Sequence, residues 1–248
     1  MITLSLCMIV KDEEDVLGRC IDSVKSIVDE IIIVDTGSVD ATKDIAKSYT
    51  DKVYDFKWID DFSAARNFSF SKATKDYILW LDADDVILEN DRIKLKKLKY
   101  NIKDDVDLVM LKYNVAFDKG GRPTFSYYRE RILKRDMKYM WTGEIHEVIE
   151  LYGNIIYEDI AVTHKKIKAN TLDRNLRIYE KIISSGKELD SRQEYYYAKE
   201  LFYNNKIDKA IERLINVINS SDAWVENKIS ACDELAHCYL IQNKKMMH

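Results

Sequence analysis

Three carboxylates packed into four positions, Asp82-Ala83-Asp84-Asp85, directly follow the apolar run 77–81. An unbroken apolar run of this length is typical of a parallel strand buried on both faces, and the ligands of open α/β sheets gather at the carboxyl ends of such strands. Carboxylate oxygens suit Mg²⁺ or Mn²⁺, with water and a diphosphate completing the coordination. The pattern therefore predicts a metal site at Asp82 and Asp84; the alternative is a polar turn that caps the next helix.

Three further charged side chains in the same half of the chain are candidates for this site, and two of them follow apolar runs. Glu13 comes after the run 3–10, Asp35 comes after the run 30–34, and Arg66 lies among small residues. A carboxylate such as Asp35 can accept hydrogen bonds from a ribose or a base, and a guanidinium can pair with a phosphate. Each residue also has a plain alternative, as a helix start, a turn former or a surface charge. Because all of them fall near strand ends, we expect them to line one site.

The elements that must hold these groups alternate between strand and helix over about the first 85 residues. This order predicts βαβ units and a mostly parallel sheet flanked by helices. Helix patterns lie at 41–48 and from 63. Strand patterns lie near 53, at 106–115 and at 124–133. From about Ala169 the pattern is helical throughout. We therefore predict an α/β domain over 1–168 and an all-α region over 169–248.

The composition limits the class of protein. A chain of 248 residues with 46% hydrophobic residues can bury a core, as one domain or as one domain with an appendage. Its 39 basic and 43 acidic residues give a net charge of -4, which argues against nucleic acid as a partner. No apolar run approaches the roughly 20 residues that span a bilayer, and the first ten residues have no basic leader. We therefore expect a cytoplasmic protein with no membrane span, and the four cysteines, which lack C-x-x-C spacing, are interpreted as reduced core thiols.

Four segments resemble the family 2 glycosyltransferases, which have the nucleotide-sugar-binding glycosyltransferase A fold. These segments, in the family's order and approximate spacing, are 5–14, 33–42, 65–67 and 80–85. The resemblance covers roughly residues 1–165 and extends to a bacterial branch in which tetratricopeptide-like helices follow the domain. Members of that branch glycosylate peptides or proteins, such as bacteriocins and flagellin. One departure is that many members carry Asp-Asp after the second strand, where this chain has Asp35-Thr36.

The resemblance implies a UDP-sugar donor and a Mn²⁺ or Mg²⁺ ion. Asp35 and Glu13 would hold the uridine, and the metal would be held by Asp82 and, more directly, by Asp84. His164 is a candidate third ligand, because related folds return a histidine to the metal near the end of the domain; the alternative is a structural histidine. The metal would neutralise charge on the departing diphosphate. The residues assigned to substrate binding are Val10, Glu13, Asp35, Thr36, Arg66, Asp82, Ala83 and Trp141.

An inverting transfer needs a base that removes the proton of the acceptor during its attack on the anomeric carbon. The segment 141–147 concentrates two acids, an imidazole and an aromatic ring beside a glycine, where the family often has an acidic pair. We predict Glu147 as the base, with Glu144 as the second candidate and His146 beside them. The alternative is a helix start whose acids complement the helix dipole. Trp141 is expected either to stack on a sugar or to pack in the core.

The helical region carries one clear copy of a tetratricopeptide helix pair. Its apolar positions, separated by a turn at 204–205, are Ala198, Leu201, Ala210, Leu214 and Val217. A second, looser copy begins near Leu235, and its second helix is predicted to start at 244–248. Because such units bury their faces against stacked neighbours, either the sequence continues in a longer protein or another subunit covers the exposed face. The tail is interpreted as an acceptor-protein platform or a homodimer surface, with a plain helical cap as the alternative.

The predicted function is an inverting, metal-dependent transfer of a hexose, GlcNAc or glucose, from a UDP-sugar to a protein or peptide side chain such as one of flagellin. One alternative keeps the chemistry but places the acceptor in a cell-envelope glycan, a lipopolysaccharide core or a wall polymer. Another is a tetratricopeptide-type scaffold with an inactive transferase domain. A nucleotidyltransferase is disfavoured, because Gly37 stands alone and no glycine-rich phosphate loop surrounds it.

Overall fold

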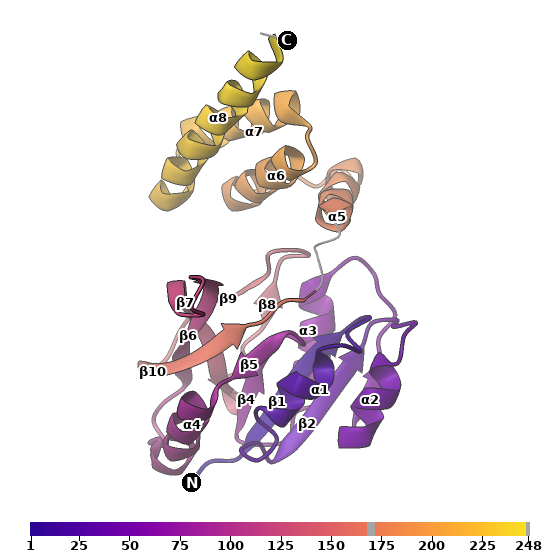
Figure 1. Cartoon of the computed structure of the whole chain (residues 1–248), viewed down its shortest axis with the longest axis vertical. Helices are drawn as coiled ribbons and strands as arrows, with labels where there is room; N and C mark the ends of the chain where they lie inside the picture. The colour runs from indigo at the N-terminus through magenta and orange to yellow at the C-terminus, as the bar shows by residue number, and fades with distance from the viewer. Residues whose placement is uncertain (168–171, 247–248) are drawn as a thin grey trace. The chain divides into compact units, whose positions relative to one another are not determined.

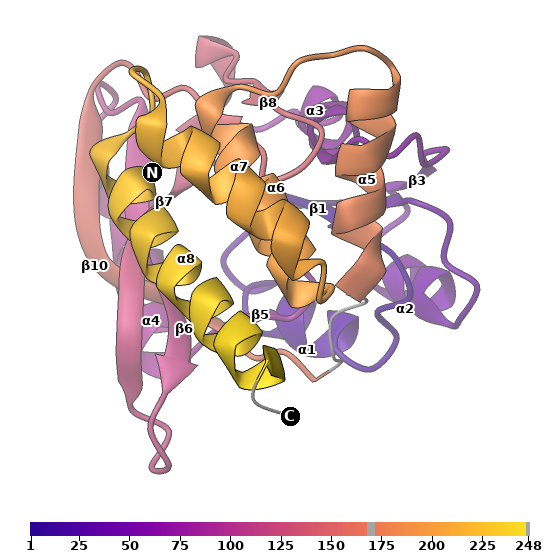
Figure 2. The same ribbon diagram turned by 90° about the horizontal axis from the view of Figure 1, so that it is seen from above.

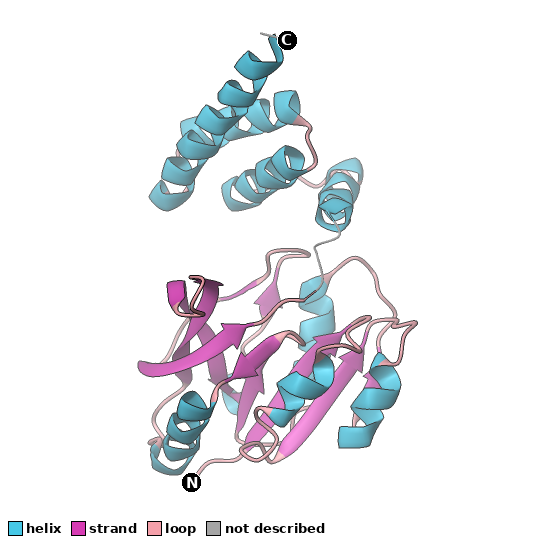
Figure 3. Ribbon diagram, viewed as in Figure 1, coloured by secondary structure: helices cyan, strands magenta, loops and turns pink. Residues whose placement is uncertain are grey.

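The structure is a computed structural model that describes residues 1–167 and 172–246. The chain divides into two compact units, Met1–Ala169 and Asn170–His248. The boundary predicted between residues 168 and 169 lies outside the described residues. The first unit contains the strands, and the second contains helices only (Figure 1, Figure 3).

The first unit is built on an eight-stranded sheet. Its strands are β1 (Leu4–Val10), β2 (Glu30–Asp35), β3 (Val53–Asp55), β4 (Tyr77–Trp80), β5 (Asp85–Ile87), β6 (Leu108–Phe117), β7 (Pro123–Lys134) and β10 (Ile155–His164). The spatial order is β3-β2-β1-β4-β7-β6-β10-β5. Pairing is parallel from β3 through β4 and between β6 and β10, and it is antiparallel at β4·β7, β7·β6 and β10·β5. The α/β fold is therefore confirmed for the described residues, with a mixed sheet that is parallel from β3 through β4.

The parallel half of the sheet explains the apolar runs in the sequence. β4 buries all of its side chains and β1 nearly all, because helices cover both faces. The helices α1 (Leu17–Asp22), α2 (Thr42–Tyr49) and α4 (Glu89–Asn101) pack on one face, and α3 (Phe62–Ser71) packs on the other (Figure 1). The carboxyl ends of β1, β2 and β4 consequently meet at one edge of the sheet.

A buried glutamate links the strands of the parallel half at the end of the sheet opposite to this carboxyl edge. The carboxylate of Glu30, at the start of β2, accepts hydrogen bonds from Ser5, from Lys52 and from the Thr74 backbone N–H at 2.9 Å. Its side chain is 2% exposed. These partners come from β1 and from the segments before β3 and β4, so a single carboxylate links four parts of the chain.

Two short strands and a helical turn complete the unit. A 3-10 turn (Arg135–Met137) leads to β8 (Trp141–Thr142), which pairs antiparallel with β9 (Val148–Ile149). Residues 143–147 form the loop of this small hairpin, so the helix considered there as an alternative is not present.

The second unit consists of α5 (Leu172–Ser184), α6 (Ser191–Tyr203), α7 (Ile207–Asn219) and α8 (Val225–Met246). The five apolar positions of the predicted helix pair are all buried in α6 and α7, and Asn205 has a positive φ of 58° in the turn between them. The second helix predicted to start at 244 is wrong, since α8 continues through Met246. Residues 225–246 contain no Gly or Pro that would end a helix. Within the described residues, no helix combines the length and apolar character that crossing a membrane requires.

Candidate active site

The acids that follow β4 meet a histidine from the last strand of the sheet. Ligand atoms of Asp84, Asp85 and His164 all lie within 4.8 Å of one another. The Nδ1 atom of His164 is 3.4 Å from Oδ1 of Asp84 and 3.5 Å from Oδ1 of Asp85. Donor atoms about 2.1 Å from one metal ion stand about 3 Å apart at adjacent octahedral positions. Two carboxylates and an imidazole at this spacing fit a single divalent ion.

The charge at this point favours a cation. Hydrogen bonds with Asp84 and then with Asp85 raise the pKa of His164 to about 9, although burial acts in the opposite direction. The hydroxyl of Tyr113 lies 2.9 Å from the same Nδ1 atom and orients the ring. The carboxylates of Asp84 and Asp85 thus favour a positive charge at this position, and a bound metal ion would supply one.

Asp85 is the member of the cluster that sequence reasoning missed. Its carboxylate is fully buried, and Oδ2 lies 3.0 Å from Nη1 of the equally buried Arg131. Oδ2 also accepts a hydrogen bond from the backbone N–H of Asp82 at 3.1 Å, which shapes the turn. Its adjacency to Asp84 was the available signal. The arginine that balances it lies 46 positions later, and nothing in the motif indicates it.

Asp82, predicted as a metal ligand, lies outside this cluster. Its Oδ1 atom accepts a hydrogen bond from Nη2 of Arg66 at 2.8 Å. Burial disfavours the ionised carboxylate, but the positive charges of Arg66 and Arg131 outweigh it and lower the pKa of Asp82 to about 2. Arg66 therefore holds the carboxylate of Asp82, and the residues that the structure brings together and that could hold a metal ion are Asp84, Asp85 and His164.

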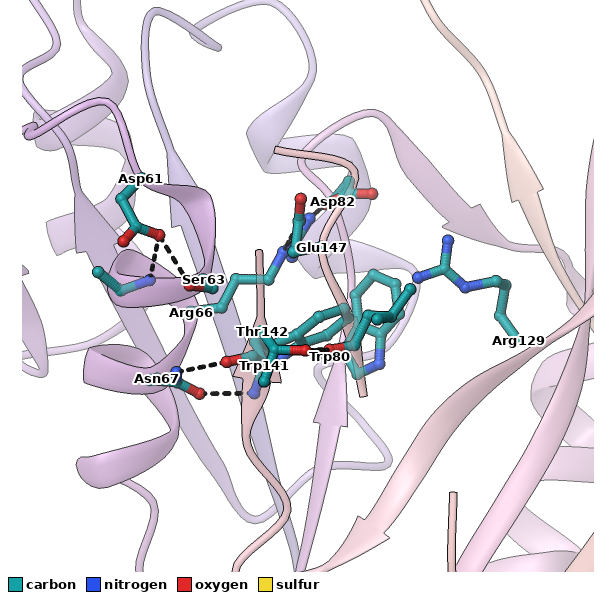
Figure 4. A network of polar contacts seen from close by, with 12 residues as sticks. Asp61, Ser63, Arg66, Asn67, Trp80, Asp82, Arg129, Trp141, Thr142 and Glu147 are labelled. Atoms are coloured by element: carbon teal, nitrogen blue, oxygen red, sulfur yellow. Dashed lines mark hydrogen bonds and ion pairs between the residues drawn. The ribbon is translucent and has the colours of Figure 1, made fainter. Parts of the chain in front are cut away.

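Arg66 connects the acidic turn to the loop predicted to carry the base. Its Nε donates to Oε1 of Glu147 at 2.6 Å, and its guanidinium carbon lies 4.9 Å from the ring centres of both Trp80 and Trp141 (Figure 4). Trp141 is only 2% exposed, and its ring packs edge-on against Trp80 at 4.9 Å. Of the two expectations for Trp141, core packing holds and stacking on a sugar does not, because neighbouring side chains cover the ring, which packs beside Arg66.

Helix α3 fixes the position of this loop. The side-chain amide of Asn67 brackets Trp141, accepting from its N–H and donating to its carbonyl at 2.9 Å each (Figure 4). The backbone N–H of Phe62 donates to the carbonyl of Glu144 at 2.9 Å. The loop itself turns through positive φ values at Gly143 and His146. Glu144 and His146 are partly buried beside Glu147, so all three predicted residues occupy one short loop.

The ends of β1 and β2 form the other part of the site. Val10 is paired with Asp35, and Thr36 donates to the Val10 carbonyl through both its N–H and its hydroxyl. Oδ1 of Asp35 accepts from the N–H groups of Gly37 and Ser38 at 2.9 and 3.0 Å. Its buried Oδ2 atom has no hydrogen-bond partner among the described residues. Since burying an unsatisfied carboxylate oxygen is costly, this atom is suited to accept a hydrogen bond from a ligand.

The remaining predicted residues lie at the same edge. Glu13 is in the turn before α1 and is partly buried, and its N–H donates to the hydroxyl of Thr42 at 2.6 Å. Ala83 is 5% exposed between Asp82 and Asp84, where its small side chain keeps the acidic turn close to the core.

Comparison with known proteins identifies the family. The model of glycosyl transferase family 2 matches residues 5–153, which is more than half of the chain. The chain therefore belongs to glycosyl transferase family 2, as the four motifs indicated.

Individual relatives include two named glycosyltransferases and one TPR repeat-containing protein. Glycosyltransferase SunS of Bacillus subtilis (strain 168) is 27% identical over 234 residues, covering 88% of this chain and 54% of that protein. An uncharacterized glycosyltransferase of Rickettsia typhi is 26% identical over 221 residues, covering 87% of this chain and 64% of its own length. A TPR repeat-containing protein of Synechococcus elongatus is 52% identical over 88 residues, covering 36% of this chain and 22% of that protein. The chain thus spans less than two thirds of each of these relatives.

Solved structures share the fold. Glucosyl-3-phosphoglycerate synthase from Mycobacterium tuberculosis, in complex with Mn²⁺ and UDP-glucose, aligns with a TM-score of 0.50 and 15% sequence identity. The alignment covers 77% of this chain and 81% of that chain. The same enzyme bound to phosphoglyceric acid gives a TM-score of 0.53 at 16% identity, with 77% and 82% coverage.

Proposed function

We propose that this protein is an inverting, metal-dependent glycosyltransferase. It transfers a hexose, with GlcNAc or glucose as the first candidates, from a UDP-sugar to a protein or peptide side chain such as one of flagellin. The observation that carries the proposal is the approach of His164 to Asp84, 3.4 Å apart at the carboxyl edge of a family 2 sheet. The two side chains offer ligand atoms for a cation, at the edge of the sheet where acidic side chains follow β1, β2 and β4.

The donor would lie along this edge. The buried Oδ2 atom of Asp35 is an acceptor for a ribose hydroxyl or a base N–H. Asp84, Asp85 and His164 are the residues that would hold Mn²⁺ or Mg²⁺. When bound, such an ion neutralises negative charge that builds on the departing diphosphate. The solved glucosyl-3-phosphoglycerate synthase of this fold is seen with Mn²⁺ and UDP-glucose and with Mg²⁺ and UDP, which supports the same choice of donor and ion here.

Glu147 is the proposed base. Its side chain is 11% exposed, and Arg66 holds one of its oxygens in a fixed position. A carboxylate that is ordered before the acceptor arrives can remove a proton without first losing rotamer freedom. Arg66 then acts as a positioning residue, because it also holds Asp82 in the acidic turn.

The peptide acceptor is proposed from the resemblance to the branch with tetratricopeptide-like helices. Helices α6 and α7 have the buried small and large apolar positions of one such pair. The 52% identity to a TPR repeat-containing protein over 88 residues supports this kinship.

The test is nucleoside diphosphate release from a panel of UDP- and GDP-sugars, with and without Mn²⁺. Metal-dependent release from one UDP-sugar, lost in Asp84→Ala and retained in the distant surface variant Asp159→Ala, is the expected result. Because a missing acceptor can suppress turnover, donor binding is measured by calorimetry on the same samples. If no nucleotide sugar bound in the presence of Mn²⁺, the transferase assignment would fail.

A further inference from the structure

The outer half of β7 has an open edge. On one side β7 pairs with β6 along most of its length, from Phe117↔Pro123 to Leu108↔Leu133. On the other side β4 pairs only with Ile132–Lys134. Within residues 1–167 and 172–246, no strand pairs with that side of residues 123–129. The main-chain N–H and C=O groups of alternate residues there point away from the sheet.

This open edge extends beyond the acidic turn. β7 is antiparallel to β4, so its residues before Ile132 continue past the carboxyl end of β4, where the segment 82–85 begins. The indole N–H of Trp80, the last residue of β4, donates to the Glu130 carbonyl and joins the two strands at that point. A new strand laid along residues 123–129 would therefore occupy the line of β4 beyond its end, at the end of the sheet where the segment 82–85 begins; β6 separates β7 from β10, which carries His164.

Residues 124–128 lack the charged side chains that usually prevent pairing at an open edge. Proteins protect open edges with charged side chains, above all lysine, and with proline and β-bulges; here Pro123 begins β7, Arg129 follows the uncharged stretch, and the pairing with β6 shifts register near Ala116. Residues 123–128, Pro-Thr-Phe-Ser-Tyr-Tyr, carry no charge, although 33% of the chain is charged, and all six are exposed. Apart from Pro123 and Ser126 they are residue types that favour strands. β6 and β7 run together to a narrow turn at the end of this hairpin (Figure 2). Such a segment is a template for an extended chain.

One face of this edge leads to the metal ligands. The ring of Phe125 lies 5.9 Å from that of Tyr127, which lies 5.7 Å from that of Tyr113. The Tyr113 ring is in turn 5.7 Å from His164. Tyr128 points to the opposite face and packs against Tyr157 at 5.0 Å. Phe125 and Tyr127, 59% and 40% exposed, would flank the side chains of an added strand on the face of His164.

We propose that the acceptor is an extended peptide that pairs with the open edge of β7 as an additional strand. The modified side chain lies on the face of Phe125 and Tyr127, directed towards the donor. An exposed row of N–H and C=O groups matches the repeat of another main chain, which a glycan does not have. The inference rests on the proposed function and specifies how that function selects its acceptor.

The test uses a library of ten-residue peptides with a central Ser, Thr or Cys, incubated with the UDP-sugar that the donor panel selects and with Mn²⁺. Mass spectrometry identifies the glycosylated peptides. In the best substrate, single backbone N-methylation is then scanned along the sequence. Pairing with an edge predicts that activity is lost at every second position only, because alternate N–H groups face β7.

Side-chain variants provide a second readout. Phe125→Ser combined with Tyr127→Ser is expected to raise the KM for the peptide roughly tenfold, with unchanged donor affinity. Tyr128→Ser, on the opposite face of the same strand, is the matched control and should change the peptide KM less than twofold. Equal effects in the two variants would overturn the inference, as would loss of activity on N-methylation without a period of two.

Two other outcomes would also overturn it. One is the absence of any glycosylated peptide while the donor still binds, which would leave the transferase assignment intact. The other is a dimer of the native chain that dissociates in the Phe125→Ser/Tyr127→Ser variant without any change in peptide KM. That result would assign the edge to a second copy of the chain.

Discussion

Arg66 and Glu147 are 81 positions apart in the sequence, yet Nε of the arginine donates to Oε1 of the glutamate at 2.6 Å. The same guanidinium reaches Asp82 at 2.8 Å. One side chain on α3 thus joins the acidic turn after β4 to the loop between β8 and β9. Helix, turn and loop are therefore expected to respond together to changes at this residue.

Glu147→Gln separates positioning from proton transfer. The amide keeps an oxygen for Arg66 but cannot remove a proton, so we expect kcat to fall at least about 100-fold while the KM for the donor and the melting temperature stay nearly constant. Steady-state kinetics and thermal unfolding measure these quantities. Glu144→Gln, in the same loop, is the control and should retain most activity; the reverse result would make Glu144 the base.

Arg131→Met tests the buried pair with Asp85. Both side chains are fully buried, so the substitution removes the arginine counter-ion of a buried carboxylate and leaves His164 beside its other oxygen. We expect the free energy of unfolding to fall by about 3–5 kcal/mol, measured by urea denaturation. Adding Asp85→Asn should recover part of this loss, because the remaining polar group is neutral. A double variant less stable than Arg131→Met would contradict the pair's role.

Asp35→Asn tests the unsatisfied oxygen at the end of β2. The asparagine oxygen can still accept from Gly37 and Ser38, but an N–H group replaces the acceptor Oδ2. We expect the Kd for UDP with Mn²⁺ to rise about tenfold at an unchanged melting temperature. Calorimetry measures the affinity, with Asp159→Asn as the surface control. Unchanged affinity would show that the nucleotide does not use this oxygen.

Glu30 predicts how stability depends on pH. Burial opposes its ionisation, but hydrogen bonds from Lys52, Ser5 and Thr74 lower its pKa from 4.5 to about 2. A carboxylate with a lowered folded-state pKa contributes stability that is complete above pH 4.5 and is lost as the pH falls towards 2. Lys52 is 45% exposed, so solvent screens part of its interaction with Glu30 and reduces the contribution to stability. We therefore expect Glu30 to contribute about 2 kcal/mol.

The measurement is urea unfolding of the native chain and of Glu30→Gln between pH 7 and pH 3. The difference in unfolding free energy between the two proteins should shrink as the pH falls below 4.5. A difference that stays constant over this range would mean that the Glu30 carboxylate is not held preferentially in its ionised form.

Local sequence predicted the parts of the site that depend on single segments. Apolar runs located β1, β2 and β4, because strands buried on both faces leave few polar positions. Asp35 and the acids after β4 could therefore be placed at strand ends. His164 came only from the resemblance, since its approach to Asp84 depends on β10 inserting between β6 and β5, a long-range pairing.

Other features depend on packing that the sequence does not express. Trp141 is buried because α3 and Trp80 pack against it. The sequence around Trp141 would be the same if its ring were exposed, so it does not predict this burial. The motif likewise does not indicate that the carboxylate of Asp82 accepts a hydrogen bond from Arg66. The helical region was simpler, because the spacing of its apolar residues reports directly which face is buried.

β10 places His164 eleven positions after the end of the family match at residue 153. The family match therefore ends before one of the three residues proposed to hold the metal ion. If helical regions were exchanged among such proteins during evolution, an exchange point at residue 153 would remove β10 and a proposed metal ligand together. Under the proposed function, active recombinants should join after residue 164, so β10 should be inherited with the first unit even where its sequence has drifted.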